Sequence, residues 1–351
     1  MNLPFLSKRI SGMALMLFTR QLSAMIKSGM PLSKSLNIIL QQTEDKKVRL
    51  AVDSVAKDIS SGKSFAESLR KTEAFPEMYC SMSAVGEAGA SLDTILSKLA
   101  SYLEKEEKLK SKIISAMAYP VVIMAISVIV VSILLIFVIP NFSEMFTEAG
   151  RELPLPTQIV LSASTFLSDY FILILLLLFA AIFGLLSYVR TPKGRFAFDS
   201  FVLSIPILGS LVKKASIARF SSTLGTLLHS GVPLIDAMKI TASTAGNMVI
   251  ENGVLKSLSS ITKGREISGP LAETALFPPM VVQMVAVGEE TGSLHEMLMH
   301  IADFYDTEVD AAVSRMTSVL EPIMILLLGV IVSGMLVAMY LPMFDMVGNI
   351  Q

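Results

Sequence analysis

Residues 121–139 read VVIMAISVIVVSILLIFVI and contain no charged side chain. Two further stretches, residues 170–189 and 322–344, are also free of charge and strongly apolar. An α-helix needs about 20 apolar residues to cross a hydrocarbon core about 30 Å thick. The sequence therefore predicts three transmembrane helices, at residues 117–139, 170–189 and 321–342.

The composition of the chain agrees with a membrane protein. Of its 351 residues, 52% are hydrophobic and 17% are charged, whereas an average soluble domain has about 25% charged residues. The single cysteine, Cys80, excludes an internal disulfide. A net charge of −1 provides no basic surface for nucleic acid. We expect the lipid bilayer, and not a nucleic acid, to be a partner of this chain.

Lysine and arginine residues beside the apolar stretches predict the orientation. Four lysines precede the first stretch and three cations follow the second, whereas residues 140–169 contain one cation, Arg151. Because cations in short loops favour the cytoplasmic side, we expect an N-terminus and two domains in the cytoplasm, at residues 1–112 and 190–316. Residues 140–169 then form an outside (periplasmic) loop, and residues 343–351 an outside tail.

The first residues imitate a secretory signal peptide, because Lys8 and Arg9 precede a short apolar run. Arg20 interrupts that run and no cleavage site of small residues follows. The same segment also recurs later in the chain, so we interpret it as a helix of the first domain.

The sequence contains one unit twice, in the same orientation. Shifted by 202 positions, the segment Ser28-Gly29-Met30-Pro31-Leu32 aligns without gaps with Ser230-Gly231-Val232-Pro233-Leu234. The agreement continues over about 125 residues, which indicates an internal repeat. The signature positions, for which we expect a structural role, are Gly29, Pro31, Pro76, Gly86, Glu87 and Pro120 in the first copy, Gly231, Pro233, Pro278, Gly288, Glu289 and Pro322 in the second, and Glu321 beside the last proline.

Each copy is predicted to be a bundle of about six helices, so the fold class is an all-α membrane protein. Apolar residues recur at helical spacing, and no run alternates with period two. Gly29 is placed to end a helix and Pro31 to begin the next. Ser64 and Ser293 have the spacing of helix capping boxes. The glycine-containing segments 86–89 and 288–292 are predicted to be hairpin turns, each followed by a helix that runs into a span.

The residues give little indication of chemistry. No phosphate-binding loop is present, so the chain has no ATPase motif of its own. His295 and His300 are five residues apart and do not share a helix face as metal ligands would. Cys80 lies between two methionines and is expected to be a buried apolar group. We therefore predict no catalytic residue, no cofactor and no metal site.

Three glutamates leave alternatives open. Glu87 and Glu289 are expected to form an ion pair within each domain or to bind the first turn of a helix, and docking of a partner is the other interpretation. Glu321 is either an interfacial anchor or part of a helix contact. Three small residues of the last span, Gly329, Ser333 and Gly334, would permit close helix approach.

The duplicated signature, with Glu321-Pro322 and the outside segment that begins at Pro140-Asn141-Phe142, resembles the F-family inner-membrane platform proteins of type II secretion and type IV pilus machines. Many members of that family have a longer leader before the first repeat. The resemblance implies a platform that couples a cytoplasmic assembly ATPase to insertion of pilin or pseudopilin subunits into a filament. It also implies contacts with other inner-membrane assembly proteins, and we expect a homo-oligomer.

A subunit of a membrane transporter or channel is the alternative. Such a protein needs a charged or aqueous pathway, and the centres of the three apolar stretches carry no ionisable residue.

Overall fold

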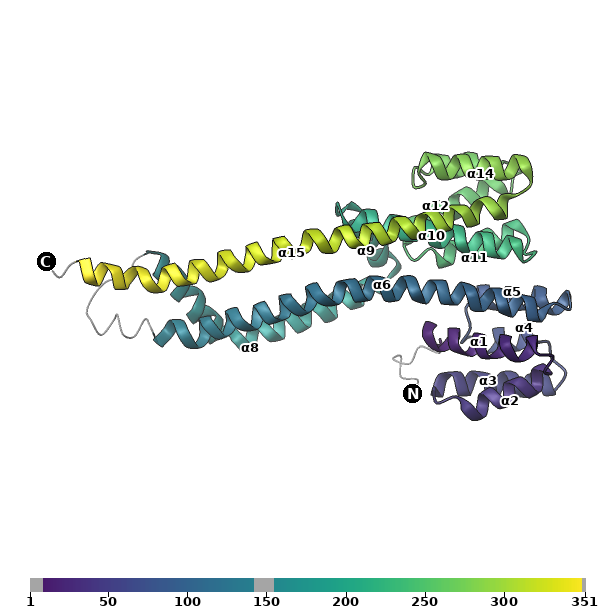
Figure 1. Ribbon diagram of the computed structural model, residues 1–351, viewed down its shortest axis with the longest axis horizontal. Helices are drawn as coiled ribbons and strands as arrows, with labels where there is room; N and C mark the ends of the chain where they lie inside the picture. Colours follow the sequence, from purple (N-terminus) through teal and green to yellow (C-terminus); the bar gives the residue numbers. More distant parts are fainter. Residues whose placement is uncertain (1–8, 142–154, 349–351) are drawn as a thin grey trace. The chain divides into compact units, whose positions relative to one another are not determined.

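The computed structural model describes residues 9–141 and 155–348. Over these two ranges the regular structure is entirely helical and contains no strand (Figure 1). The prediction of an all-α fold is therefore confirmed. The chain divides into two compact units: Met1–Lys112 with Asp199–Ala311, which we call unit 1, and Ile113–Phe198 with Ala312–Gln351, which we call unit 2.

Unit 1 contains the N-terminal part of each copy of the repeat, and each copy contributes six helices, as predicted. The helices of the first copy are α1 (Gly12–Lys27), α2 (Leu32–Gln42), α3 (Lys46–Ser60), α4 (Phe65–Thr72), α5 (Glu77–Ala88) and α6 (Leu92–Ile133). Those of the second copy are α10 (Leu208–His229), α11 (Leu234–Thr244), α12 (Met248–Ile261), α13 (Ser268–Glu273), α14 (Pro279–Thr291) and α15 (Leu294–Gly348). The last helix of each copy continues into unit 2.

The ends of these helices follow from local chemistry. Gly29 and Gly231 adopt φ values of 82° and 85°, a left-handed conformation that glycine tolerates without strain. Pro31 and Pro233 are the N-cap residues of α2 and α11. The Ser64 hydroxyl accepts the backbone N–H of Glu67 at 3.1 Å, as its capping-box spacing predicts. The Ser293 hydroxyl instead pairs with Thr291 Oγ1 at 2.6 Å, because α14 ends beside it with a second hydroxyl in reach.

The predicted turns at 86–89 and 288–292 are wrong in their extent. The helices α5 and α14 continue through both Gly-Glu pairs and end at Ala88 and Thr291. Gly292, with φ 72°, is the left-handed residue that ends α14. A glycine two or three residues before a helix end permits close packing without breaking the helix, and the sequence alone does not distinguish this role from that of a turn.

Equivalent ring contacts occur in the hydrophobic core of both copies in unit 1. The rings of Phe18 and Phe75 lie 5.8 Å apart, and their equivalents Phe220 and Phe277 lie 4.9 Å apart. Cys80 is buried in this core, and burial raises the pKa of its thiol to about 11. Since the thiolate is the reactive form, the only cysteine of the chain is protected while the first copy is folded.

Unit 2 contains the apolar helices. Among the described residues, three helices are long and apolar enough to cross a membrane, Leu92–Asn141, Leu155–Val189 and Leu294–Leu341, and they include the three predicted spans except for residue 342. The second of these is α8 (Leu155–Val189), so residues 155–169 of the predicted outside loop are helical. Residues 142–154 of that predicted loop lie outside the described residues.

Hydroxyl groups join the helices of unit 2. Thr157 Oγ1 donates a hydrogen bond to the Ala338 carbonyl of α15 at 2.6 Å. Ser164 donates to the Leu135 carbonyl, which belongs to the π-helical segment η1 (Leu134–Val138) that follows α6. A π-helical turn disturbs the regular ladder, and here a buried serine of the neighbouring helix binds one of its carbonyls.

Like α8, the helix α9 (Pro192–Ser204) has no counterpart in the first copy; it lies between α8 and α10 in the chain (Figure 1). Among its aromatic side chains, Phe196, Phe198 and Phe201 are exposed.

Candidate functional site

The carboxylate of the signature residue Glu87 binds the start of the short helix α4. Its two oxygens accept the backbone N–H groups of Phe65 at 2.7 Å and Ala66 at 3.1 Å. These groups are the first two N–H groups of α4 and have no partner within that helix. Together with Ser64, which binds the N–H of Glu67, the carboxylate satisfies the start of α4 from another helix, α5.

The second copy has the same device. Glu289 of α14 accepts the N–H of Ser268 at 2.9 Å and also the N–H of Ile267. These two residues stand 202 positions after Phe65 and Ala66, so the pair of contacts is repeated position by position. A carboxylate at a helix start is favoured by both the unpaired N–H groups and the helix dipole.

The glycine before each glutamate lies where two helices come closest. A β-carbon added to Gly86 would lie 2.9 Å from the β-carbon of Ile95, and one added to Gly288 would lie 2.9 Å from Leu294 Cα. Any larger residue would push α6 away from α5, or α15 away from α14. The Gly-Glu pair therefore sets both the spacing of the helix hairpin and the direction of the preceding short helix.

The other predicted residues are spread over the fold. Pro76 and Pro278 are the N-cap residues of α5 and α14, while Pro120 lies inside α6 and Pro322 inside α15. Glu321 is exposed on α15. The three small residues of the last span, Gly329, Ser333 and Gly334, are also exposed on α15. A β-carbon added to either glycine would meet no atom within 4 Å.

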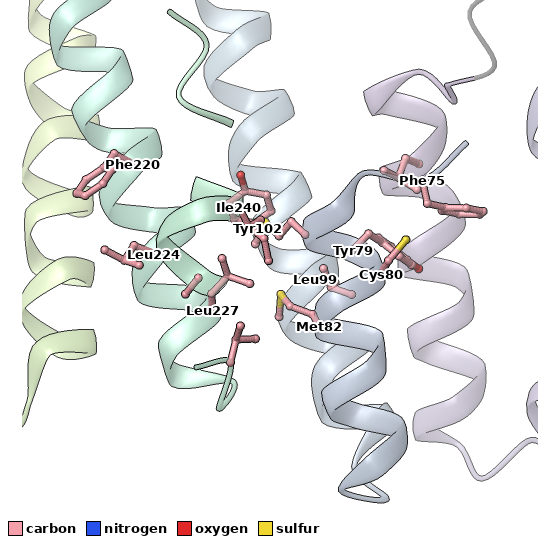
Figure 2. Close-up of a cluster of buried hydrophobic side chains, with 14 of the residues drawn as sticks. Phe75, Tyr79, Cys80, Met82, Leu99, Tyr102, Phe220, Leu224, Leu227 and Ile240 are labelled. Atoms are coloured by element: carbon pink, nitrogen blue, oxygen red, sulfur yellow. The ribbon is translucent and has the colours of Figure 1, made fainter. Parts of the chain in front are cut away.

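The two copies meet through a contact that sequence reasoning missed. Figure 2 shows buried side chains around it, among them Met82 of α5 and Leu99 of α6 in the first copy and Leu227 of α10 and Ile240 of α11 in the second. At its centre the Tyr102 hydroxyl lies 2.9 Å from Thr223 Oγ1, and both residues are buried. Next to it, Glu106 Oε2 lies 2.9 Å from Arg219 Nε. Burial raises the pKa of the Glu106 carboxyl, and the nearby guanidinium opposes that shift.

Ion pairs extend this contact along α6 and α15. Lys105 Nζ lies 3.0 Å from Asp303, and Lys112 Nζ lies 2.7 Å from Asp310. Within each helix the two partners are seven residues apart, which is two helical turns. Since both numbers increase together, α6 and α15 run in the same direction here, as a parallel repeat requires. The seven-residue spacing of lysines and aspartates was the available sequence signal.

A cavity of about 640 Å³ lies at the same contact. All three histidines of the chain line it, and the rings of His229 and His295 stack with centroids 5.0 Å apart. Burial lowers the pKa of His229, and the charges of Lys98 and His295 add to this effect. In the described parts of the chain no three His, Cys, Asp or Glu side chains are grouped to hold a metal ion.

The cavity is lined by equivalent positions of the two copies. Six pairs separated by 202 residues face it: Lys27 and His229, Asp93 and His295, Thr94 and Glu296, Ser97 and Met299, Lys98 and His300, and Ser101 and Asp303. Contact through the same patch on both partners is the arrangement of a two-fold symmetric dimer. The two copies thus form a pseudo-dimer within one chain.

Comparison with known proteins agrees with this duplication. The sequence model described as "Type II secretion system (T2SS), protein F" matches residues 18–140 and again residues 220–342, which is the same 202-residue shift. The chain belongs to the type II secretion system protein F family. Its two family domains begin in α1 and α10 and extend through the first and third apolar helices.

Relatives of this F-family chain cover almost its whole length. It is 41% identical to the type IV pilus assembly protein PilC of Myxococcus xanthus, over 97% of this chain and 82% of that protein. It is 40% identical to PilC of Pseudomonas aeruginosa, over 98% and 92%. With the type II secretion system protein F of Vibrio cholerae the identity is 33%, over 96% and 83%.

We predict that Glu87→Ala loosens the first copy. Loss of the carboxylate leaves two N–H groups of α4 without partners and costs about 2 kcal/mol. Because the buried Cys80 thiol is labelled only after the first copy opens, this loss raises the rate of labelling about 30-fold. The measurement is maleimide labelling of the full chain in detergent micelles. Glu289→Ala makes the same change in the other copy and should affect Cys80 less; an unchanged rate in Glu87→Ala would contradict the prediction.

We also predict that Tyr102 and Thr223 are energetically coupled. Tyr102→Phe leaves a buried hydroxyl without its partner and lowers the free energy of unfolding by about 1–3 kcal/mol. In the double variant, Tyr102→Phe with Thr223→Val, the loss of unfolding free energy should be about 1 kcal/mol smaller than the sum of the two single losses. Thermal unfolding of the full chain, followed by circular dichroism, measures these effects. The control is Tyr305→Phe, a buried tyrosine of α15; simple additivity would refute the coupling.

Proposed function

We propose that this F-family protein is the inner-membrane platform of a filament-assembling machine, with the N-terminus and both helical copies of unit 1 in the cytoplasm. It would couple a cytoplasmic assembly ATPase to the insertion of pilin or pseudopilin subunits. The observation that carries the proposal is the similarity to pilus assembly and secretion F proteins along nearly the full chain. The higher identity to the pilus assembly proteins, 41 and 40% against 33%, favours a pilus over a secretion filament.

The geometry supports a scaffold rather than a catalyst. The signature carboxylates are used by helix starts, as the N–H contacts of Glu87 and Glu289 show. The two copies are joined by a buried contact, so they offer a motor protein one combined surface. The last helix of each copy continues without a break from unit 1 into an apolar stretch. A movement of either copy could therefore be transmitted to a membrane span through one continuous helix.

The proposed partners can be tested on the whole chain. Membranes from cells that contain this protein should retain the cognate assembly ATPase, and membranes from a deletion strain should lose it together with surface filaments. Retention of the ATPase without the chain would contradict the proposed coupling. A transporter or channel would instead show substrate flux in proteoliposomes that contain this chain alone, and such flux would replace the proposal.

The exposed small residues of α15 give a prediction within this proposal. Replacing both Gly329 and Gly334 by leucine should abolish filament assembly, because the bulk would prevent close approach of a pilin helix or of a second platform copy. Membrane insertion should be unaffected, since leucine is more apolar than glycine.

The measurement is the amount of surface filament beside the amount of platform protein in the membrane. Gly184→Leu is the matched control, because Gly184 of α8 is equally open in the structure. Normal filaments in the Gly329 and Gly334 variant would contradict the role of this face.

A further inference from the structure

The helix α9 carries apolar side chains that no core in the described chain uses. Phe196 and Phe198 are 43% and 41% exposed, and Phe201 is 64% exposed. The following Ile207 is 43% exposed. Neither family domain includes this segment, which lies between residues 140 and 220. Several large apolar groups in one short exposed helix require a partner surface.

Hydropathy alone would join α9 to α10 as a broken span, bent by 111°. The residues of α10 exclude that interpretation. Phe220, Leu224 and Leu227 of this helix are fully buried in the core of unit 1 and are not available to lipid. The 13 residues of α9 reach about 20 Å at 1.5 Å per residue, too short to cross a bilayer alone.

The beginning of α9 is fixed at the end of the apolar helix α8. Thr191 Oγ1 accepts the backbone N–H of Gly194 at 3.1 Å. A β-carbon at Gly194 would lie 2.0 Å from the Tyr188 carbonyl oxygen, so only glycine allows this sharp turn. The turn follows directly after Val189, the last residue of a helix long enough to cross the membrane. The first turn of α9 must therefore lie next to the bilayer surface.

The middle of α9 is fixed as well. Asp199 Oδ2 accepts the backbone N–H of Met248 at 2.7 Å, at the start of α12. Asn247 Nδ2 donates to the Asp199 carbonyl at 3.3 Å. Asp199 is the only acidic residue between 190 and 207, where the cations are Arg190, Lys193 and Arg195. Three cations and one acid give the segment a net charge of +2 beside its aromatic side chains.

We propose that α9 is an interfacial helix that binds the anionic lipid surface beside α8. Phenylalanine side chains enter the boundary between headgroups and acyl chains, and Lys193 and its neighbouring arginines meet lipid phosphates. Long cationic side chains can extend to the headgroups while the helix lies at that depth. This inference requires only that α8 crosses a membrane and does not depend on the pilus or secretion role.

The absence of tryptophan from the chain provides a clean probe. The full-length variant Phe201→Trp is placed in vesicles of phosphatidylcholine with phosphatidylglycerol, with bromine attached at defined depths of the acyl chains. We expect a blue-shifted emission that is quenched most by bromine near the headgroups. Phe198→Trp provides a second probe position if the first variant does not fold, as judged by circular dichroism.

The matched control is Phe304→Trp. Phe304 is 47% exposed on α15, about 27 Å of helix before Pro322 at 1.5 Å per residue, so its replacement should not be quenched. Lys193→Glu should reduce the dependence of quenching at position 201 on phosphatidylglycerol. Absence of quenching at 201, strongest quenching by bromine at the bilayer centre, or quenching indifferent to anionic lipid would each overturn the proposal.

Discussion

The contact between Tyr102 and Thr223 depends on the common direction of α6 and α15 within unit 1. Because α6 and α15 run in the same direction, equivalent faces of the two copies meet. The ion pairs of Lys105 with Asp303 and of Lys112 with Asp310 can then both form. An inverted repeat would place the copies on opposite sides. The helices α8 and α9, which have no counterpart in the first copy, lie between the two copies along the chain.

The Gly-Glu pairs show how far a short motif constrains a helical bundle. A short helix such as α4 has almost no cooperativity of its own, and its start is stabilised by a carboxylate from α5. The same carboxylate follows a glycine that lets α6 approach. Three helices are thus oriented by two adjacent residues, and the second copy uses the same solution at Gly288 and Glu289. Such economy explains why this pair recurs at an unchanged spacing in both halves of the chain.

Much of the fold could be predicted because its signals are local or periodic. Uncharged stretches gave the apolar helices, and the ungapped shift from Phe18 to Phe220 gave the duplication. The hairpin turns were placed too early, since Gly86 and Gly288 are helical and serve packing. The candidate site was largely missed for a different reason. The pairing of Tyr102 with Thr223 and of Glu106 with Arg219 depends on the register between two helices more than 100 residues apart, and no local pattern encodes that register. The helix α9 was also missed, because it lies outside the repeat on which the helix predictions were based.

The cavity at the contact has a consequence for how the two halves can change. In a dimer of identical chains, every substitution appears on both sides of the two-fold axis, so a histidine at one position would face a histidine at the same position. Here the two sides belong to one polypeptide, and equivalent positions that line the cavity carry different side chains: Lys27 and His229, Asp93 and His295, and Lys98 and His300. Covalent linkage keeps the ratio of the halves at one to one while allowing each to acquire its own charge. Two partners that approach this joint from different sides would therefore meet chemically different surfaces on the same scaffold.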